Sequence, residues 1–293
     1  MAQALRETAV GAAPAAPGPA ERRLARVRAA ADRLAPQREA FRQLAAVPDI
    51  DGPRIRLGVA WAVVTAGFVA AGPIPLAVWL SAAALVAAGN TARAWRQTER
   101  RPIGTIVVFG SAAFPIAAAF GPTGVLVVAG AVVVATAAWD PAAGAFHQPA
   151  GIQANLPLTI ATPMCIGLAA ASPILVRDIG LVEALVLLSF VCVYDASAYL
   201  VGTGSASPWE GPAAGAAFIL AVTLAVAAVF VPPFRGVTPW LFGFMAAVLA
   251  PIGPHVASAL LPDPKSRAPA LRRLDSLLVL GPAWTLVALL LLA

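Results

Sequence analysis

Charged side chains are scarce in this chain. Only 12% of its 293 residues are Asp, Glu, Lys or Arg, whereas about a quarter are charged in an ordinary soluble domain. Hydrophobic residues make up 60%, and the mean hydropathy is +0.82. A soluble fold could not bury this much apolar surface, but lipid can solvate it, and helices satisfy their own backbone hydrogen bonds there. The composition therefore predicts an all-α integral membrane protein.

Cysteine is also rare, which excludes two classes of site. Cys165 and Cys192 lie inside hydrophobic runs without C-x-x-C spacing, so we expect no disulfide framework and no zinc site.

The first 50 residues hold charges throughout and no apolar core of the signal-peptide type, so no cleaved signal is expected. The net charge of +6 comes mostly from arginines between apolar runs. This pattern favours a topogenic role and predicts no nucleic-acid partner.

Two domains are predicted: residues 1–55, a disordered or amphipathic basic segment, and residues 56–293, a polytopic membrane domain. Residues 1–18 are rich in Ala, Pro and Gly, as is typical of disorder. The stretch 21–44 has an apolar stripe flanked by arginines. It fits an amphipathic helix on an anionic membrane surface and equally a solvated linker helix.

Nine apolar stretches follow, each predicted to be a membrane-spanning helix. A span needs about 20 apolar residues, and shorter ones are tolerated by thinning of the bilayer. We place the spans at 57–71, 74–91, 103–120, 123–139, 156–174, 180–200, 212–231, 237–261 and 276–293. Helix-breaking pairs such as Gly72-Pro73 and Gly121-Pro122 separate them. The predicted fold is a bundle of about nine transmembrane helices with a basic N-terminal cytoplasmic segment.

The basic residues fall on one side if the nine spans alternate in direction. Ten arginines precede residue 57, and four Lys or Arg lie in each of the connections 92–102 and 262–275, which makes 18 of the 20 basic residues. Only Arg177 and Arg235 are left on the opposite side. Because basic residues favour the inside, the N-terminus is predicted in the cytoplasm and the chain in the cytoplasmic (inner) membrane.

Two acids lie within predicted spans, where a charge costs about 2.5–3.5 kcal/mol. Glu183 is near the start of its span, and a structural role is favoured for it. Asp195 lies near the end of the sixth span, and Gly202, Gly204 and Glu210 follow in a polar segment. This pattern predicts a site for a polar headgroup or a metal-bound nucleotide, or else an interfacial loop with ordinary turn glycines.

Three segments of the C-terminal third carry motifs. They are 195–215, D-A-S-A-Y-L-V-G-T-G-S-A-S-P-W-E-G-P-A-A-G; 253–263, G-P-H-V-A-S-A-L-L-P-D; and 272–278, R-R-L-D-S-L-L. In order, they resemble the D-x-x-A-Y-x-x-G … S-P-K-K-T-W-E-G-x-x-G, G-D-L-x-E-S-x-x-K-R-D and D-R-x-D-S-L-L segments of the phosphatidate cytidylyltransferase (CDP-diacylglycerol synthase) family. The rest of the chain resembles that family only in its hydrophobic helices.

That family joins CTP to phosphatidic acid, forming CDP-diacylglycerol and pyrophosphate with divalent metal. The resemblance implies CTP, phosphatidic acid or another lipid phosphate, and membrane lipids as partners, with Mg²⁺ as the cofactor of an active enzyme. A homodimer is a further candidate assembly. It implies catalytic roles for Asp195, Glu210 and Asp275, metal binding by Asp275 and Asp263, and substrate binding by Ser207, Arg272 and Arg273.

The chain also departs from the family pattern. Pro254 and Arg272 stand where the family has acids, the K-K pair before W-E-G is missing, and the K-D and H-G-G elements have no counterpart. His255, beside Pro254, is a candidate substitute ligand or a structural histidine. Two functions stay open: a divergent cytidylyltransferase of phospholipid biosynthesis, and a catalytically degenerate relative that acts as a lipid-binding or accessory membrane protein.

The orientation is testable by cysteine accessibility. If the connections 92–102, 201–211 and 262–275 face the cytoplasm, cysteines introduced at Thr98, Ser205 and Ser266 will react with an impermeant maleimide only after the cells are permeabilised. Labelling of any of the three in intact cells would overturn the predicted topology.

Overall fold

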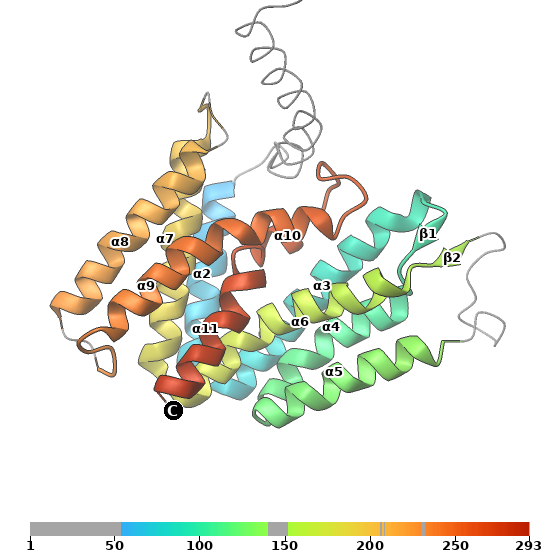
Figure 1. The fold of residues 1–293 in the computed structure, drawn as a ribbon, viewed down its shortest axis with the longest axis horizontal. Helices are drawn as coiled ribbons and strands as arrows, with labels where there is room; N and C mark the ends of the chain where they lie inside the picture. The colour runs from blue at the N-terminus through green and yellow to red at the C-terminus, as the bar shows by residue number, and fades with distance from the viewer. Residues whose placement is uncertain (1–53, 140–151, 206, 208, 230–231, 293) are drawn as a thin grey trace, which may run out of the picture. The chain divides into compact units, whose positions relative to one another are not determined.

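Ten α-helices and two very short strands make up the described part of the chain (Figure 1). The computed structural model describes residues 54–139, 152–205, 207, 209–229 and 232–292, all within one compact unit. Of the predicted N-terminal segment 1–55, all but the last two residues lie outside this description. The elements are α2 (Arg54–Ala71), α3 (Pro73–Ala94), β1 (Arg100–Arg101), α4 (Gly104–Ala118), α5 (Pro122–Ala137), β2 (Gln153–Ala154), α6 (Leu156–Ile179), α7 (Leu181–Gly202), α8 (Glu210–Ala228), α9 (Thr238–Leu249), α10 (Gly253–Ala259) and α11 (Leu277–Leu291).

The helices begin where the sequence places breaks. Gly72 and Gly121 have φ of 116° and 84°, a region that favours glycine. Pro73 and Pro122 follow in the first helical turn, where a missing N–H leaves no hydrogen bond unmade. The side-chain oxygen of Asn155 caps α6 by accepting a backbone N–H of its first turn. Each of the nine predicted apolar segments contains a helix in the described residues, α9 and α10 sharing one segment.

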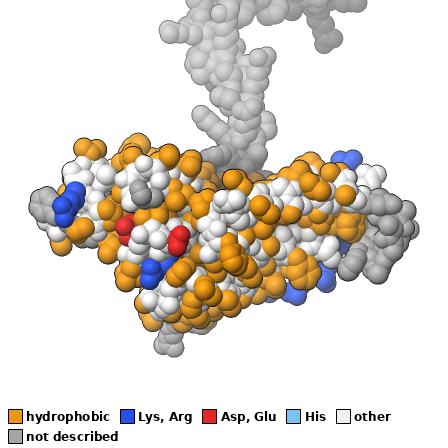
Figure 2. Space-filling model, turned by 90° about the horizontal axis from the view of Figure 1, so that it is seen from below, with side chains coloured by type: hydrophobic (Ala, Val, Ile, Leu, Met, Phe, Trp, Pro, Cys, Tyr) orange, Lys and Arg blue, Asp and Glu red, His pale blue; other side chains and the backbone are white. Residues whose placement is uncertain are grey.

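Five helical segments are long and apolar enough to cross a membrane: α3, α6, α7, α8, and α9 with α10, which a 3₁₀ turn joins end to end. The remaining apolar helices, α2, α4, α5 and α11, are shorter. Many large hydrophobic side chains point outward, among them Phe120 and Leu290, which are 80% and 73% exposed. Figure 2 shows one face that is largely hydrophobic and has few charged side chains. Such a surface supports a membrane protein.

Helices α4 and α6 run parallel and in register. The strands that precede them, β1 and β2, pair in parallel. The backbone N–H of Ile103 then donates to Thr159 Oγ1 at 3.0 Å. Farther along, Gly167 lies so close to the Phe114 ring that a Cβ at this position would overlap the ring. Both helices therefore begin at the same end of the bundle, and the chain returns between them through α5.

Contacts between helix ends distinguish two sides of the bundle. On one side, Trp95 after α3 donates from Nε1 to the carbonyl oxygen of Leu260 after α10, at 3.0 Å. On the other side, Arg177 near the end of α6 donates from Nε to the carbonyl oxygen of Val69 near the end of α2, at 2.7 Å. Arg177 thus satisfies a helix-terminal carbonyl. This bond gives the basic residue a structural reason to lie apart from the basic connections.

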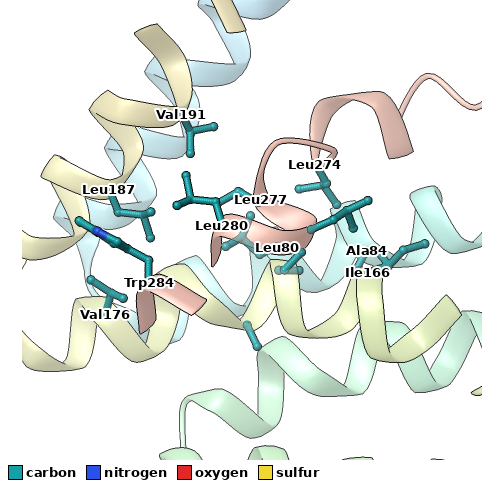
Figure 3. Packing of buried hydrophobic residues seen from close by; sticks show 14 of the residues in the cluster. Leu80, Ala84, Ile166, Val176, Leu187, Val191, Leu274, Leu277, Leu280 and Trp284 are labelled. Carbon is teal, nitrogen blue, oxygen red and sulfur yellow. The ribbon is translucent and has the colours of Figure 1, made fainter. Parts of the chain in front are cut away.

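Helix α11 lies within the buried hydrophobic cluster (Figure 3). Its Trp284 is 1% exposed, and Figure 3 shows the indole beside Leu187 of α7. The indole packs edge-on against Phe190 and Phe242, with ring centroids 6.1 and 4.9 Å apart, and stacks on Phe234 at 6.2 Å. These rings join α11 to α7 and α9, so the last helix is held from several directions.

The α4–α6 contact is testable by adding one methyl group. Gly167→Ala should destabilise the protein because overpacking costs about 1–3 kcal/mol, while helix propensity returns at most about 1 kcal/mol. Gly130→Ala in α5 is the matched control, since nothing lies within 4 Å of its Cβ position. We expect Gly167→Ala to unfold at a lower temperature than Gly130→Ala in detergent. Equal unfolding temperatures would contradict the close packing.

Candidate functional site

Polar residues meet where α7 approaches its end and α11 begins. Ser276, directly before α11, donates from Oγ to Asp195 Oδ1, and Asp195 lies in the C-terminal half of α7. Deeper in the bundle, Phe190 of α7 packs against Trp284 of α11. Residue numbers fall along α7 as they rise along α11, so the two helices are antiparallel. The contact therefore joins segments that are distant in the sequence.

Ser276 also holds Asp275. Its backbone N–H donates to Asp275 Oδ1 at 2.9 Å, and its Oγ lies 3.5 Å from the same oxygen. Asp275 is only 8% exposed, and Asp195 is partly buried. We call Asp195 and Asp275, bridged by Ser276, the carboxyl pair. The structure brings these two predicted residues together, and their catalytic roles stay predictions.

Arg273 is a cationic neighbour of both carboxyl groups. Its Nη1 lies 3.2 Å from the position that a Cβ would take on Gly58, so a larger residue in α2 would press on the guanidinium. Burial raises the pKa of Asp275 above the ordinary carboxyl value, and the Arg272 cation and the donors of Ser276 offset part of this rise. The site thus combines two acids with two fixed cations.

Arg272 forms hydrogen bonds with α10 and with the connection that follows α10. Its Nη1 donates to the carbonyl oxygen of Pro254 at 3.2 Å, and its Nη2 donates to Ser258 Oγ and to the carbonyl oxygen of Pro264, both at 3.0 Å. These bonds tie the turn that carries Arg272 to α10 and to the connection after it. Burial lowers the pKa of Arg272, and the Asp275 carboxylate opposes this shift. Substrate binding by Arg272 stays a prediction, and the observed bonds are structural.

The other predicted site residues lie at the start of α8 and in loops. Glu210 is exposed in the first turn of α8, and Ser207 Oγ accepts the Trp209 N–H at 3.4 Å. Asp263 is exposed, and its Oδ1 accepts the Lys265 N–H at 2.8 Å. In the part of the chain that the structure describes, no three or more His, Cys, Asp and Glu side chains are grouped to hold a metal ion. The roles of Glu210, Ser207 and Asp263 therefore stay predictions.

Two carboxylates are enough protein ligands for one kind of metal site. Mg²⁺ is commonly held by one or two carboxylates, with water and substrate phosphates completing the shell. Asp195 and Asp275 are close enough to be bridged by one hydroxyl group, so they fit a Mg²⁺ that arrives with a nucleotide. They do not fit a site built from protein ligands alone.

Sequence reasoning missed Ser276 and Gly253. A Cβ at Gly253 would overlap the carbonyl of Asp275, so glycine alone lets α10 approach the backbone of the carboxyl pair this closely. Both residues lie within the quoted motif segments. A serine placed just before an apolar helix is a capping signal that could have drawn attention to Ser276, but nothing local indicates that its hydroxyl reaches Asp195.

Comparisons with protein-family models, with curated proteins and with solved structures give no match for this chain. The family resemblance accordingly depends on the quoted motif residues.

Protonation of Asp275 has a testable effect on stability. Its pKa is raised on folding, so the folded state binds the proton more tightly than the unfolded state does. The contribution of this proton to the free energy of unfolding is fully present below the ordinary carboxyl pKa of about 4, and it is lost as the pH rises through the raised value. Asp275→Asn removes the charge and keeps an oxygen that can accept the Ser276 N–H. Between about pH 4 and pH 7, this variant should therefore lose less stability than wild type, as measured by thermal unfolding.

The control for this experiment is Asp178→Asn, an exposed acid near the end of α6 on the opposite side of the bundle. It should keep the wild-type dependence on pH. If Asp275→Asn shows the same dependence as wild type, the carboxyl of Asp275 is not held in the buried environment described above.

Proposed function

We propose that this chain is a divergent CTP:phosphatidate cytidylyltransferase-like protein of phospholipid biosynthesis, built as a bundle of about nine transmembrane helices. The carboxyl pair carries the proposal. Asp195 belongs to the first motif and Asp275 to the last, and Ser276 bridges them. Gly253, from the middle motif, packs against Asp275. Three motif segments that meet at one place support a common site.

The proposed location is the cytoplasmic membrane, with the N-terminus and the carboxyl pair on the cytoplasmic side. Ten Lys and Arg side chains are described: seven of them lie in the α3–α4 and α10–α11 connections, and Arg93 lies in the last turn of α3. The bond from Trp95 to Leu260 places these connections on the same side. Arg177 lies at the opposite ends of the helices. This distribution supports the orientation, because basic connections favour the inside.

In the proposed reaction, an oxygen of the lipid phosphate attacks the α-phosphorus of CTP. The bond from this phosphorus to the oxygen that bridges it to the β-phosphate breaks, and pyrophosphate leaves with the electron pair. The attacking phosphate is already an anion at neutral pH, so the main requirement is positive charge that holds the phosphates together. Arg273 offers such a charge beside the carboxyl pair. Asp195 and Asp275 would hold Mg²⁺, which supplies charge neutralisation for the leaving pyrophosphate.

A catalytically degenerate relative, acting as a lipid-binding or accessory membrane protein, is the second candidate. Arg272 favours it, because the family has an acid at this position and the arginine here binds backbone oxygens of its own chain. In such a protein Arg273 would bind a lipid phosphate through paired hydrogen bonds, with little dependence on divalent metal.

Incorporation of radiolabelled CTP into lipid tests the enzymatic proposal. Purified protein with phosphatidic acid and magnesium should form labelled CDP-lipid slowly. Asp195→Asn should lower the rate by about 100-fold or more, as loss of one transition-state contact often does. Asp178→Asn, on the opposite side, should keep the wild-type rate. No incorporation by the wild-type protein would reject the enzymatic proposal.

Binding of phosphatidic acid vesicles then decides the second candidate. If the protein binds without turnover, Arg273→Ala should weaken binding more than chelation of magnesium does, and Arg273→Lys should restore part of it. Absence of both turnover and binding would reject the two candidates together.

A further inference from the structure

A second concentration of positive charge lies outside the three motif segments. Residues 93–101 run from the last turn of α3 through β1 and contain four arginines, and we call this segment the arginine turn. Arg93, Arg96 and Arg100 are exposed, and Arg101 is partly buried. Glu99 is the only acid within the segment, which leaves a net charge of +3. None of the motif segments includes it.

The arginine turn is held in a defined shape. Thr98 Oγ1 lies 2.8 Å from the carbonyl oxygens of Trp95 and Arg100, which accept its hydrogen bond. Arg100 Nε donates to Gln153 Oε1 at 3.2 Å, and β1 pairs with β2. The Trp95 indole N–H donates to Leu260 at 3.0 Å. The backbone of the turn is therefore ordered before a ligand arrives, which lowers the entropy cost of binding.

The arginine turn also lies at the end of a long apolar helical segment. The apolar helical segment that leads into it, Pro73–Gln97, is long enough to cross a membrane. Arg93 and Arg96 stand at the end of this segment, and Trp95 between them is partly buried. Tryptophan and arginine near the end of a span are typical of the interface between hydrocarbon and water. A ligand at this position meets both positive charge and an apolar surface.

We propose that the arginine turn binds the phosphate headgroup of an anionic phospholipid. The exposed guanidinium groups match phosphate oxygens in charge and in paired hydrogen-bond geometry, and the position at the end of an apolar helix favours a lipid over a nucleic acid. This inference does not rest on the proposed enzymatic function, because it concerns different residues and requires no turnover.

Native mass spectrometry of the purified full chain in detergent provides the test, with phosphatidylglycerol and phosphatidylcholine as probes. Wild type should retain phosphatidylglycerol in preference. Arg93→Gln/Arg96→Gln should weaken phosphatidylglycerol binding about 30-fold, at about 1 kcal/mol for each basic residue near a membrane surface. The single variant Arg93→Gln should weaken it about fivefold on the same basis, which keeps the test decisive if the double variant does not fold.

The matched control is Lys265→Gln/Arg267→Gln, which removes the same charge from exposed residues of the α10–α11 connection. It should change phosphatidylglycerol binding by less than about threefold, because it leaves the guanidinium groups of the arginine turn in place. An equal loss in both double variants would show that net charge alone matters and would overturn the proposal. Preferential binding of a duplex oligonucleotide over phosphatidylglycerol vesicles would also overturn it.

Discussion

The hydrogen bond from Ser276 to Asp195 is the interaction on which the arrangement of the site depends. An acid inside an apolar helix is costly unless it finds a polar partner, and Asp195 finds one where α11 begins. The same serine holds Asp275 through its backbone N–H. Docking of α11 against α7 therefore satisfies one acid and places a second beside it, so that packing and site formation are the same event.

Two glycines leave the space that the docking of α11 requires. Gly253 lets α10 touch the backbone of Asp275, and Gly58 leaves room for the Arg273 guanidinium beside α2. Arg272 then ties the turn before α11 to α10. Small residues serve this purpose in membrane bundles because packing there depends on contact between backbones and not on exclusion of water. The two arginines thus differ in their contacts, since Arg272 binds α10 and Arg273 lies beside Gly58 of α2, while both are cationic neighbours of Asp275.

Much of the fold was predictable because its signals are local. Gly72-Pro73 and Gly121-Pro122 mark helix starts through the backbone geometry of two adjacent residues, and the apolar segments were long enough to identify. Helix length was less predictable: α2, α4, α5 and α11 are shorter than a typical span. For the site, motif order indicated Asp195 and Asp275. Glu210 and Asp263 carried the same motif signal, yet both are exposed in the structure.

The sequence by itself determined the helical class, the positions of the helices and the gathering of basic residues in a few connections, because hydropathy, turn residues and charge act over a few to about 20 neighbouring residues. Only the tertiary structure decided that α4 and α6 run parallel, that Arg177 binds the end of α2, and that Ser276 bridges the carboxyl pair. These contacts join residues tens of positions apart, and they depend on how closely small side chains let the helices approach.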